Sequence, residues 1–508
     1  MLLDDFSELE NTRLEKMLRM RDEGIEPYPT RSAKNMNNAE ALKAFEAAEV
    51  GGKTEVPDIV LAGRIRAIRD MGKICFAHIE DSSGKIQLFL RVNELGEEKL
   101  ASFIRDFDLG DFIQASGALT RTRRGEITLM VHDFVMLAKA LYQLPADKDQ
   151  VIDGETVRHS VLTDPETRYR QRYVDLAVNP EVREIFKARA KIVDTVREYL
   201  DHRGYIEVET PILQPIYGGA AARPFTTYHN QLHQELFLRI SFELYLKRLI
   251  VGGMDRVYEI GRDFRNEGVS FKHNPEFTQL ELYEAYTDYH GMMRIAEEMI
   301  SQCAYELNGH YLINYDGHEI DLTPPWPRLT IRQGLIDFAG IDIVDYPTAE
   351  ALESLLKERE IPFKPGVPRG KLIGILMEEY IEPRLIQPTF LCNYPRDISP
   401  LAKNVPGDPS TVERFEIFIG GVEMGNAFTE LNDPIEQEKR FMEMASAYAA
   451  DDEEQHPMDH DFVRALAYGM PPTGGMGIGI DRLVMMLTGK NTLREVILFP
   501  HLRKIEDQ

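Results

Sequence analysis

Two separate segments of the chain together carry the groups that a bound nucleoside triphosphate needs. The first is residues 264–277, which begin FRNEG and end HNPEF, and the second is residues 475–482 (GMGIGIDR). Arg265 and Arg482 can neutralise phosphates, Phe277 can stack on a base, and the alternating glycines let the backbone approach a ligand closely. Neither arginine is informative alone. Their order and spacing predict a site for a bent nucleoside triphosphate.

A smaller unit precedes these segments, because residues 59–137 alternate apolar and polar side chains with the period of β-strands. The alternation predicts five strands, at 59–69, 73–81, 85–92, 112–122 and 126–137, with an amphipathic helix at 97–106 in the third gap. Five strands with one helix in that gap indicate an OB-fold barrel, a fold that commonly binds oligonucleotides. Another amphipathic helix is expected at 7–21.

One face of the predicted barrel carries side chains that suit an unpaired base. If the apolar residues point inward, the alternation turns Arg64, Phe76, Gln87 and Glu126 outward. An outward phenylalanine can stack on a base, and the amide, carboxylate and guanidinium can read the edge of that base. The pattern fits equally well a Phe76 that lies beneath a neighbouring domain.

A larger unit follows a polar connector. Residues 144–172 show little periodicity, and residues 180–203 then form an amphipathic helix that ends at Gly204. A strand is expected at 205–209 and a further helix at 243–251. Both helices and strands are expected in this unit, and the expected fold class of the chain is α+β.

Composition and charge narrow the possible functions. The chain has 508 residues, three cysteines without ligand-like spacing, and a net charge of −25. This charge argues against nucleic-acid binding driven by electrostatics alone and leaves a selective, base-reading contact. No apolar run reaches membrane-spanning length, and the N-terminus lacks a basic targeting region. We expect a cytoplasmic protein with reduced cysteines, without structural zinc and without membrane contact.

Several motifs resemble those of the class II aminoacyl-tRNA synthetases. Residues 204–211 (GYIEVETP) resemble motif 1, residues 264–267 resemble motif 2, and residues 475–482 resemble motif 3. Within this class the chain is most similar to the bacterial-type lysyl-tRNA synthetases, and the resemblance covers nearly the whole chain. The segments that indicate this subgroup are 218–225 (GGAAARPF), 243–247 (ELYLK), 281–283 (ELY) and 426–432 (NAFTELN).

The resemblance implies a domain organisation and a reaction. An N-terminal helix and an OB-fold anticodon-binding domain would occupy 1–145, a connector 146–172, and a catalytic domain, with an antiparallel sheet flanked by helices, 173–508. The implied reaction activates L-lysine with ATP, releases pyrophosphate, and transfers lysine to the 3′ end of tRNA(Lys). Motif 1 resembles a dimer-interface segment, so a homodimer with 180–211 buried between the subunits is expected.

The resemblance also implies a lysine pocket. The residues so implied are Glu243 and the backbone of Gly218 for the α-ammonium, Glu281, Tyr283 and Glu430 for the ε-ammonium, Asn426 and Arg265 for the carboxylate, and Phe428 for the aliphatic stem. A physical argument agrees, because three carboxylates beside a triphosphate would be unfavourable unless cations joined them. Lysine brings two ammonium groups, one at each end.

The implied nucleotide contacts follow in the same way. They are Arg265 at the α-phosphate, Arg482 at the γ-phosphate end and near the base, His273 toward the β- and γ-phosphates, Phe277 against adenine, Glu267 and the Asn274 backbone at the adenine edge, and Glu416 through a metal ion. Glu416 and Glu423 offer the hard oxygen ligands that Mg²⁺ favours. A carboxylate nucleophile is already ionised at neutral pH, so no general base is needed. Arg265 and Arg482 are therefore the expected catalytic residues.

The barrel would read the U-rich anticodon, with Phe76 stacking on a base and Arg64, Gln87 and Glu126 contacting base edges. One departure from the family pattern is Ser241-Phe242, where relatives often carry Ala-Pro before Glu243. We expect this departure to change the start of the helix and not the acidic group.

Three other functions compete with this one. A purely nucleic-acid-binding protein would not need the intact arginines and glutamates, and a protein-modifying paralogue would lack the barrel. Charging with aspartate or asparagine is the nearest alternative within the class, although such a site would need cations beside its side-chain pocket.

Overall fold

The computed structural model describes the chain except for residues 1–5, 146–147, 153–154, 160–161, 448–456 and 505–508. It contains two compact units, Met1–Thr163 and Asp164–Gln508. This division falls inside the predicted connector. The finer domain boundaries at 145 and 172 stay predictions.

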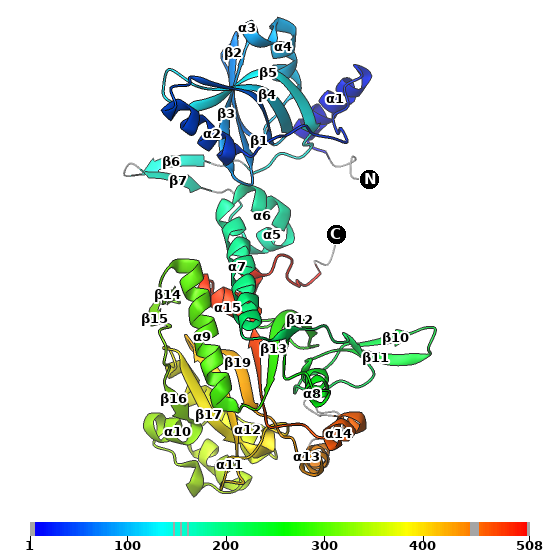
Figure 1. The fold of residues 1–508 in the computed structure, drawn as a ribbon, viewed down its shortest axis with the longest axis vertical. Coiled ribbons are helices and arrows are strands. Elements are labelled where there is room, and N and C mark those ends of the chain that lie inside the picture. Colours follow the sequence, from blue (N-terminus) through cyan, green and yellow to red (C-terminus); the bar gives the residue numbers. More distant parts are fainter. Residues whose placement is uncertain (1–5, 146–147, 153–154, 160–161, 448–456, 505–508) are drawn as a thin grey trace. The chain divides into compact units, whose positions relative to one another are not determined.

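The first unit is built around a closed barrel with the strand order β1-β2-β3-β5-β4 (Figure 1). Its strands are β1 Glu55–Asp70, β2 Ile74–Asp81, β3 Gly84–Arg91, β4 Phe112–Arg121 and β5 Ile127–Ala138. Helices α3 (Val92–Leu95) and α4 (Glu97–Asp106) lie between β3 and β4 in the chain. The OB-fold prediction is confirmed, and the apolar residues at alternate positions, such as Ile65 and Leu129, are buried in the barrel core.

Two helices precede the barrel. α1 (Glu8–Asp22) was expected and begins with a capping box between Ser7 and Glu10. α2 (Asn38–Val50) was not expected. The sequence does contain a start signal for this helix, because Asn37 is followed three residues later by Glu40, as in a capping box. In the structure the Glu40 carboxylate accepts a hydrogen bond from the backbone N–H of Asn37 at 2.8 Å.

The connector is more structured than predicted. It holds an antiparallel hairpin, β6 (Lys148–Ile152) with β7 (Glu155–His159), followed by helices α5 (Pro165–Arg170) and α6 (Arg172–Val178). These elements are short, and short elements give too few repeats for a periodic signal in the sequence.

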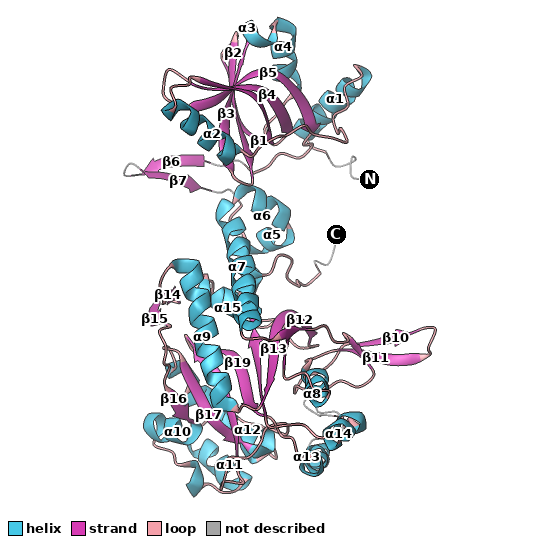
Figure 2. Ribbon diagram, viewed as in Figure 1, coloured by secondary structure: helices cyan, strands magenta, loops and turns pink. Residues whose placement is uncertain are grey.

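The second unit contains an eight-stranded sheet, which Figure 2 shows between helices. In spatial order its strands are β16 Arg328–Thr330, β17 Thr389–Pro395, β18 Thr411–Ile419, β19 Val422–Thr429, β20 Thr473–Gly479, β13 Glu276–Ala285, β12 Arg256–Phe264 and β8 Ile206–Glu207. The six central strands are antiparallel, as predicted, whereas β16 and β8 pair in parallel at the two edges. The sheet is therefore mixed.

The strand predicted at 205–209 contracts to the two residues of β8. Beyond it the backbone of Thr210 donates to the side chain of Glu259, at 3.0 Å, instead of continuing the ladder.

Helices cover both faces of this sheet. α7 (Pro180–His202), α9 (Tyr289–Asn308) and α15 (Ile480–Leu487) share one hydrophobic core with Leu280 and Leu282 of β13. Tyr283, the neighbour of Leu282, belongs to the core of the opposite face. Strand alternation therefore turns Glu281 and Tyr283 away from α7 and α9.

The remaining elements complete the second unit. They are β9 Leu213–Gln214, β10 Thr226–His229, β11 Gln234–Leu238, α8 Glu243–Val251, β14 Leu312–Tyr315, β15 His318–Asp321, α10 Ile331–Ala339, α11 Ala349–Glu358, α12 Arg369–Tyr380, α13 Pro434–Ala447, α14 His460–Ala467, α16 Leu493–Val496, and three 3-10 turns at Ile343–Asp345, Glu382–Arg384 and Arg396–Ile398. Among the described residues, no helix combines the length and the apolar character that a bilayer span requires.

Candidate functional site

A cavity of about 390 Å³ opens on the face of the large sheet that carries Glu281 and Tyr283. Strands β13, β19 and β20 supply part of its lining, and the segments before and after β12 supply much of the rest. Twelve residues that the sequence predicted for the substrate and metal sites line it. They are Glu243, Arg265, Glu267, His273, Asn274, Phe277, Glu281, Tyr283, Glu423, Asn426, Phe428 and Arg482.

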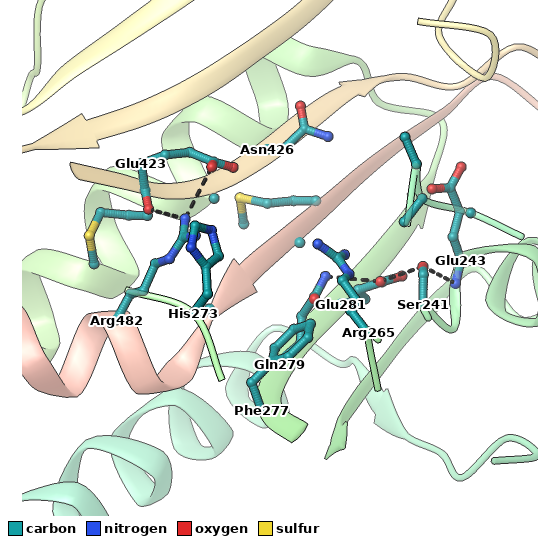
Figure 3. Close-up of a pocket in the computed structure, with 18 of the residues that line it drawn as sticks. Ser241, Glu243, Arg265, His273, Phe277, Gln279, Glu281, Glu423, Asn426 and Arg482 are labelled. Atoms are coloured by element: carbon teal, nitrogen blue, oxygen red, sulfur yellow. Dashed lines mark hydrogen bonds and ion pairs between the residues drawn. The ribbon is translucent and has the colours of Figure 1, made fainter. Parts of the chain in front are cut away.

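Figure 3 shows that these side chains form two groups within the cavity. Glu243, Ser241 and Glu281 gather at one end with Arg265. Arg482, Glu423 and His273 gather at the other. Carboxylates therefore dominate the first end, and the two predicted catalytic arginines lie in different groups.

Three hydrogen-bond donors hold the Glu281 carboxylate. The Ser241 hydroxyl donates to Oε1 at 2.7 Å, the Gln279 amide donates to Oε1 at 3.0 Å, and the Tyr283 hydroxyl donates to Oε2 at 3.2 Å. In the part of the chain that the structure describes, Glu281 forms no ion pair. Burial, together with the nearby Asp263 and Glu243 carboxylates, raises the pKa of Glu281 well above its usual value. The carboxylate is fixed in place and lacks a cation.

Ser241 has a larger role than its position in the sequence suggested. Besides donating to Glu281, its oxygen accepts the backbone N–H of Glu243 at 3.1 Å. This contact agrees with the expected effect of Ser241 on the start of α8, whereas its bond to Glu281 was not expected. Its hydroxyl ties the first residue of that helix to a carboxylate on β13.

Glu243 and Glu430 are joined by a buried ammonium group. The Lys247 Nζ lies 2.6 Å from Glu243 Oε1 and also forms an ion pair with Glu430 Oε2. The side chains of Lys247 and Glu430 are both 0% exposed. Glu430 is not itself part of the cavity lining, but its Oε1 lies beside Gly475, which lines the cavity, while its Oε2 pairs with Lys247.

Close packing surrounds this acidic group. A Cβ atom added to Gly475 of β20 would overlap both Glu430 Oε1 and the ring of Tyr283. A Cβ added to Gly218 would press on the side chain of Leu244, and Gly218 itself does not line the cavity, although Gly219 does. Glycine at 475 lets the backbone of β20 lie directly against the acidic residues.

Arg265 lies between the acidic residues and the rest of the cavity. Its guanidinium lies 5.1 Å from the centroid of the Phe277 ring, and its Nε and Nη2 atoms each donate to the Ile240 carbonyl at 3.4 Å. Over the described residues Arg265 forms no ion pair with a carboxylate. Its charge is therefore available to an anionic ligand.

Arg482 and His273 mark the opposite end. Arg482 donates from Nη1 to the Glu423 carbonyl at 2.7 Å and to Glu423 Oε2 at 3.0 Å. Burial and the nearby positive charge of Arg482 lower the pKa of His273, whose Nδ1 lies 2.9 Å from the Ser270 hydroxyl. Asn274 is fixed by its side chain, which donates to the Glu276 carbonyl at 2.5 Å.

Arg414 links two predicted site residues and was missed in the sequence. It donates to Asn426 Oδ1 at 2.8 Å and to Glu416 Oε1 at 2.8 Å. Burial and the carboxylate of Glu423 raise the pKa of Glu416 to about 7, although Arg414 opposes this shift. Glu416 lies outside the cavity lining, whereas Arg414 lies within it.

Lys247, Gln279 and Arg414 were missed as site residues. Lys247 lies in the 243–247 segment but was given no role, and Gln279 and Arg414 resemble ordinary surface residues in the sequence. The only signal was strand alternation, since Gln279 and Arg414 lie two residues from Glu281 and Glu416 on the same faces of β13 and β18.

Of the residues predicted for a base-reading face of the barrel, Gln87 and Glu126 are in contact, and Phe76 stacks on Phe89. The rings of Phe76 and Phe89 stack with centroids 4.6 Å apart and an interplanar angle of 6°. The Glu126 carboxylate accepts from the Gln87 amide at 2.6 Å and lies 3.1 Å from His78 Nε2. Arg64 lies apart from this group, with its guanidinium 4.3 Å from the centroid of the Phe112 ring. Both rings of the Phe76–Phe89 pair are only half-buried in the first unit.

Comparisons with known proteins agree with this geometry. The model of the class II tRNA synthetases for D, K and N matches residues 164–503, and that of the OB-fold nucleic acid binding domain matches residues 59–137. A lysine–tRNA ligase of Chloroflexus aurantiacus is 50% identical over 505 residues, which cover 99% of this chain and 100% of the relative. Lysine–tRNA ligases of Roseiflexus castenholzii and Moorella thermoacetica are 50% and 47% identical, over 99% and 100% of this chain and 100% of each relative.

Proposed function

The chain belongs to the class II lysine–tRNA ligases, and from this premise we propose that the acidic end of its cavity binds the two ammonium groups of L-lysine while the other end binds ATP. The observation that carries the proposal is the state of Glu281, which three donors orient and no cation neutralises. A substrate ammonium completes such a site, since a buried carboxylate without a counter-charge is unfavourable.

In the proposed first step, a carboxylate oxygen of lysine attacks the α-phosphorus of ATP. A bond forms between that oxygen and phosphorus, the bond to the bridging oxygen breaks, and pyrophosphate leaves with its electron pair. Arg265, which lies beside the acidic side chains, contacts the lysine carboxylate and the α-phosphate together. Its fixed charge offsets the negative charge that builds up around phosphorus.

Other residues orient ATP in this scheme. Arg482 holds the γ-phosphate end, with His273 beside it, and Phe277 supports the adenine. Glu267 lines the same cavity and reads the adenine edge with the Asn274 backbone. The bent conformation of ATP follows from the placement of Arg265 and Arg482 in different parts of one cavity.

Glu416 and Glu423 fit Mg²⁺. They lie on neighbouring strands, β18 and β19, and burial together with the negative charge of Glu423 raises the pKa of Glu416 to about 7. Mg²⁺ is usually held by one or two carboxylates plus substrate phosphates, so this pair supplies the protein share of a site. When bound, the ion would neutralise negative charge on the phosphates. The described residues contain no group of three acidic, histidine or cysteine side chains suited to a metal.

In the proposed second step, a hydroxyl of the terminal tRNA ribose attacks the carbonyl carbon of lysyl-adenylate. An ester bond to the ribose forms, and AMP leaves. The same lysine contacts hold the amino acid through both steps, so the acidic end serves activation and transfer alike.

An amino-acid panel in the ATP–pyrophosphate exchange assay tests this function. We expect exchange with lysine and none with aspartate, which would place a carboxylate against Glu281 and Glu430. Asparagine should fail as well, because its carboxamide brings no positive charge to these carboxylates. Ornithine is one methylene shorter and should lose roughly 1–3 kcal/mol, which is about 5- to 150-fold in kcat/KM. Exchange that depends on aspartate and not on lysine would refute the proposed pocket.

We also propose that the barrel binds the anticodon of tRNA(Lys) on the face that carries Phe76. The stacked Phe76–Phe89 pair offers an aromatic surface to a base, and the Gln87–Glu126 pair offers a donor and acceptors to a base edge. Arg64, whose guanidinium lies over Phe112, would meet the backbone or a base at the margin of this face.

Phe76→Ala is expected to weaken tRNA charging and to leave adenylate formation intact. Base–aromatic stacking is worth roughly 1–3 kcal/mol per base, so kcat/KM for tRNA should fall by about 5- to 150-fold. Lysine-dependent exchange, which needs no tRNA, serves as the control in the same preparation. Equal losses in the two assays would contradict the anticodon role.

We propose that the chain forms a homodimer through its motif 1 region. β8 is an edge strand, and exposed apolar side chains lie along this segment at Ile206, Ile212 and Leu213. Unpaired strand edges with apolar side chains favour pairing with another chain. Sedimentation of the active protein should therefore give twice the chain mass, and an active monomer would overturn the proposal.

We assign a cytoplasmic location together with this function. Cys75, Cys303 and Cys392 are free and buried, as expected of a protein kept in a reducing compartment.

A further inference from the structure

Lys247 is a buried cation whose partners are two of the carboxylates proposed above for the substrate. Its side chain is 0% exposed, and it does not line the cavity. The aromatic rings of Phe428 and Phe462 lie 5.3 and 5.9 Å from its Nζ atom. The ammonium is therefore separated from both solvent and substrate.

The two ion pairs of Lys247 join different parts of the unit. Glu243 precedes Lys247 by one turn of α8, and their atoms are 2.6 Å apart. Glu430 directly follows β19, far along the chain. In the proposed function, Glu243 receives the α-ammonium of lysine and Glu430 receives the ε-ammonium. One resident ammonium thus contacts the acceptors of both ends of the substrate.

The charges explain why a cation is needed behind the cavity. Glu243, Glu281 and Glu430 contribute three negative charges, and Lys247 compensates one of them. Two remain, which equals the number of ammonium groups on L-lysine. Charged groups this deeply buried interact strongly, so a mismatch of one charge carries a large energetic cost.

We propose that Lys247 is a specificity-determining residue, which acts through Glu243 and Glu430 to match the acidic pocket to an amino acid with two ammonium groups. This inference rests on the proposed function. Without the Lys247 charge, Glu243 and Glu430 would remain as neighbouring buried carboxylates, and one of them would take up a proton instead. A protonated Glu430 has lost its negative charge, so it distinguishes an ammonium from a methyl group less strongly.

The directions of the pKa shifts agree with this reasoning. Burial raises the pKa of Glu430 well above its usual value, Lys247 opposes that rise, and Glu243 adds to it. For Lys247 burial lowers the pKa, but Glu243 and Glu430 raise it by more, so the ammonium stays charged.

The test compares lysine with norleucine, which has the same length but ends in a methyl group. The KM for lysine and the inhibition constant of norleucine are measured by pyrophosphate exchange in Lys247→Met and in Lys247→Gln. The second variant keeps hydrogen-bond donors for both carboxylates and removes only the charge, so it guards against misfolding. Lys357→Met on α11, an exposed lysine, is the matched control.

We expect the preference for lysine over norleucine to fall in both Lys247 variants and to stay unchanged in the control. A hydrogen bond to a charged group corresponds to roughly a 10- to 100-fold change, so the ratio of the two constants should fall by about that factor. The KM for ATP should remain within about twofold, since neither Lys247 nor its partners Glu243 and Glu430 are among the proposed ATP contacts. Equal weakening of lysine and norleucine would overturn the proposal, because it would show a purely structural role.

The Glu281→Gln variant distinguishes a failure of the Lys247 proposal from a failure of the proposed lysine-binding function. If this variant also loses the preference for lysine while the Lys247 variants keep it, only the role of Lys247 is wrong. If Glu281→Gln keeps the full preference, the proposed placement of lysine fails, and the Lys247 proposal fails with it.

Discussion

Arg265→Ala is expected to abolish lysine-dependent pyrophosphate exchange, with kcat reduced by roughly 10³-fold. Arg265 has no carboxylate partner among the described residues and lies against Phe277, so its charge is held in place for the substrates. In the proposed mechanism it contacts both reacting groups. Its loss therefore removes charge stabilisation in the transition state as well as binding.

Arg262→Ala provides a matched control, because Arg262 lies on β12, three residues before Arg265. That arginine is 42% exposed, and its Nε lies 3.7 Å from Glu276, so its removal should change exchange by less than about twofold. Arg265→Lys keeps a charge without the planar fork and should give an intermediate rate. A near-normal rate in Arg265→Ala would refute its central role.

Gly475→Ala is expected to have the second-largest effect, concentrated on lysine. The added methyl group would overlap Glu430 Oε1 and the Tyr283 ring, both of which belong to the proposed ε-ammonium site. Overpacking in a tight interior typically costs about 1–3 kcal/mol, and the displaced carboxylate loses its charged contact besides. We therefore expect kcat/KM for lysine to fall by roughly 100-fold, with little change in the KM for ATP.

Gly374→Ala on α12 is the control for this substitution, because no atom lies within 4 Å of an added Cβ there. It should leave activity unchanged and raise stability slightly, since alanine favours a helix. If Gly475→Ala impaired ATP and lysine equally, general distortion of β20 would explain the loss better than a local clash.

Much of the fold was predictable because its elements are long and periodic. The barrel strands and α7 repeat their apolar positions often enough to define a period, and the five-strand order with α4 inserted identifies the OB fold. The connector hairpin was missed, and β8 was predicted to be longer than it is, because strands of two to five residues are too short to show a period. α2 could have been found from Asn37 and Glu40.

Site residues were predictable where they belong to a recognisable motif. They were not predictable where only the fold brings them close to the other site residues. Arg265, Glu281 and Arg482 lie in recognisable segments and line one cavity, as expected. Lys247 could not be found in this way, because its partner Glu430 is distant in the chain and a lysine on an amphipathic helix usually lies at the surface. Ser241 was noticed, but its contact with Glu281 depends on the packing of α8 against β13.

The alternation along β13 has a consequence for how this enzyme can change over time. Leu280 and Leu282 belong to the core shared with α7 and α9, whereas Glu281 and Tyr283 face the cavity. Insertion or deletion of a single residue here would exchange the two sets of side chains. The glutamate would then face the hydrophobic core, and the leucines would face the substrate cavity. A change of amino-acid preference through β13 therefore requires substitutions at existing positions, because insertions and deletions would move the glutamate out of the cavity.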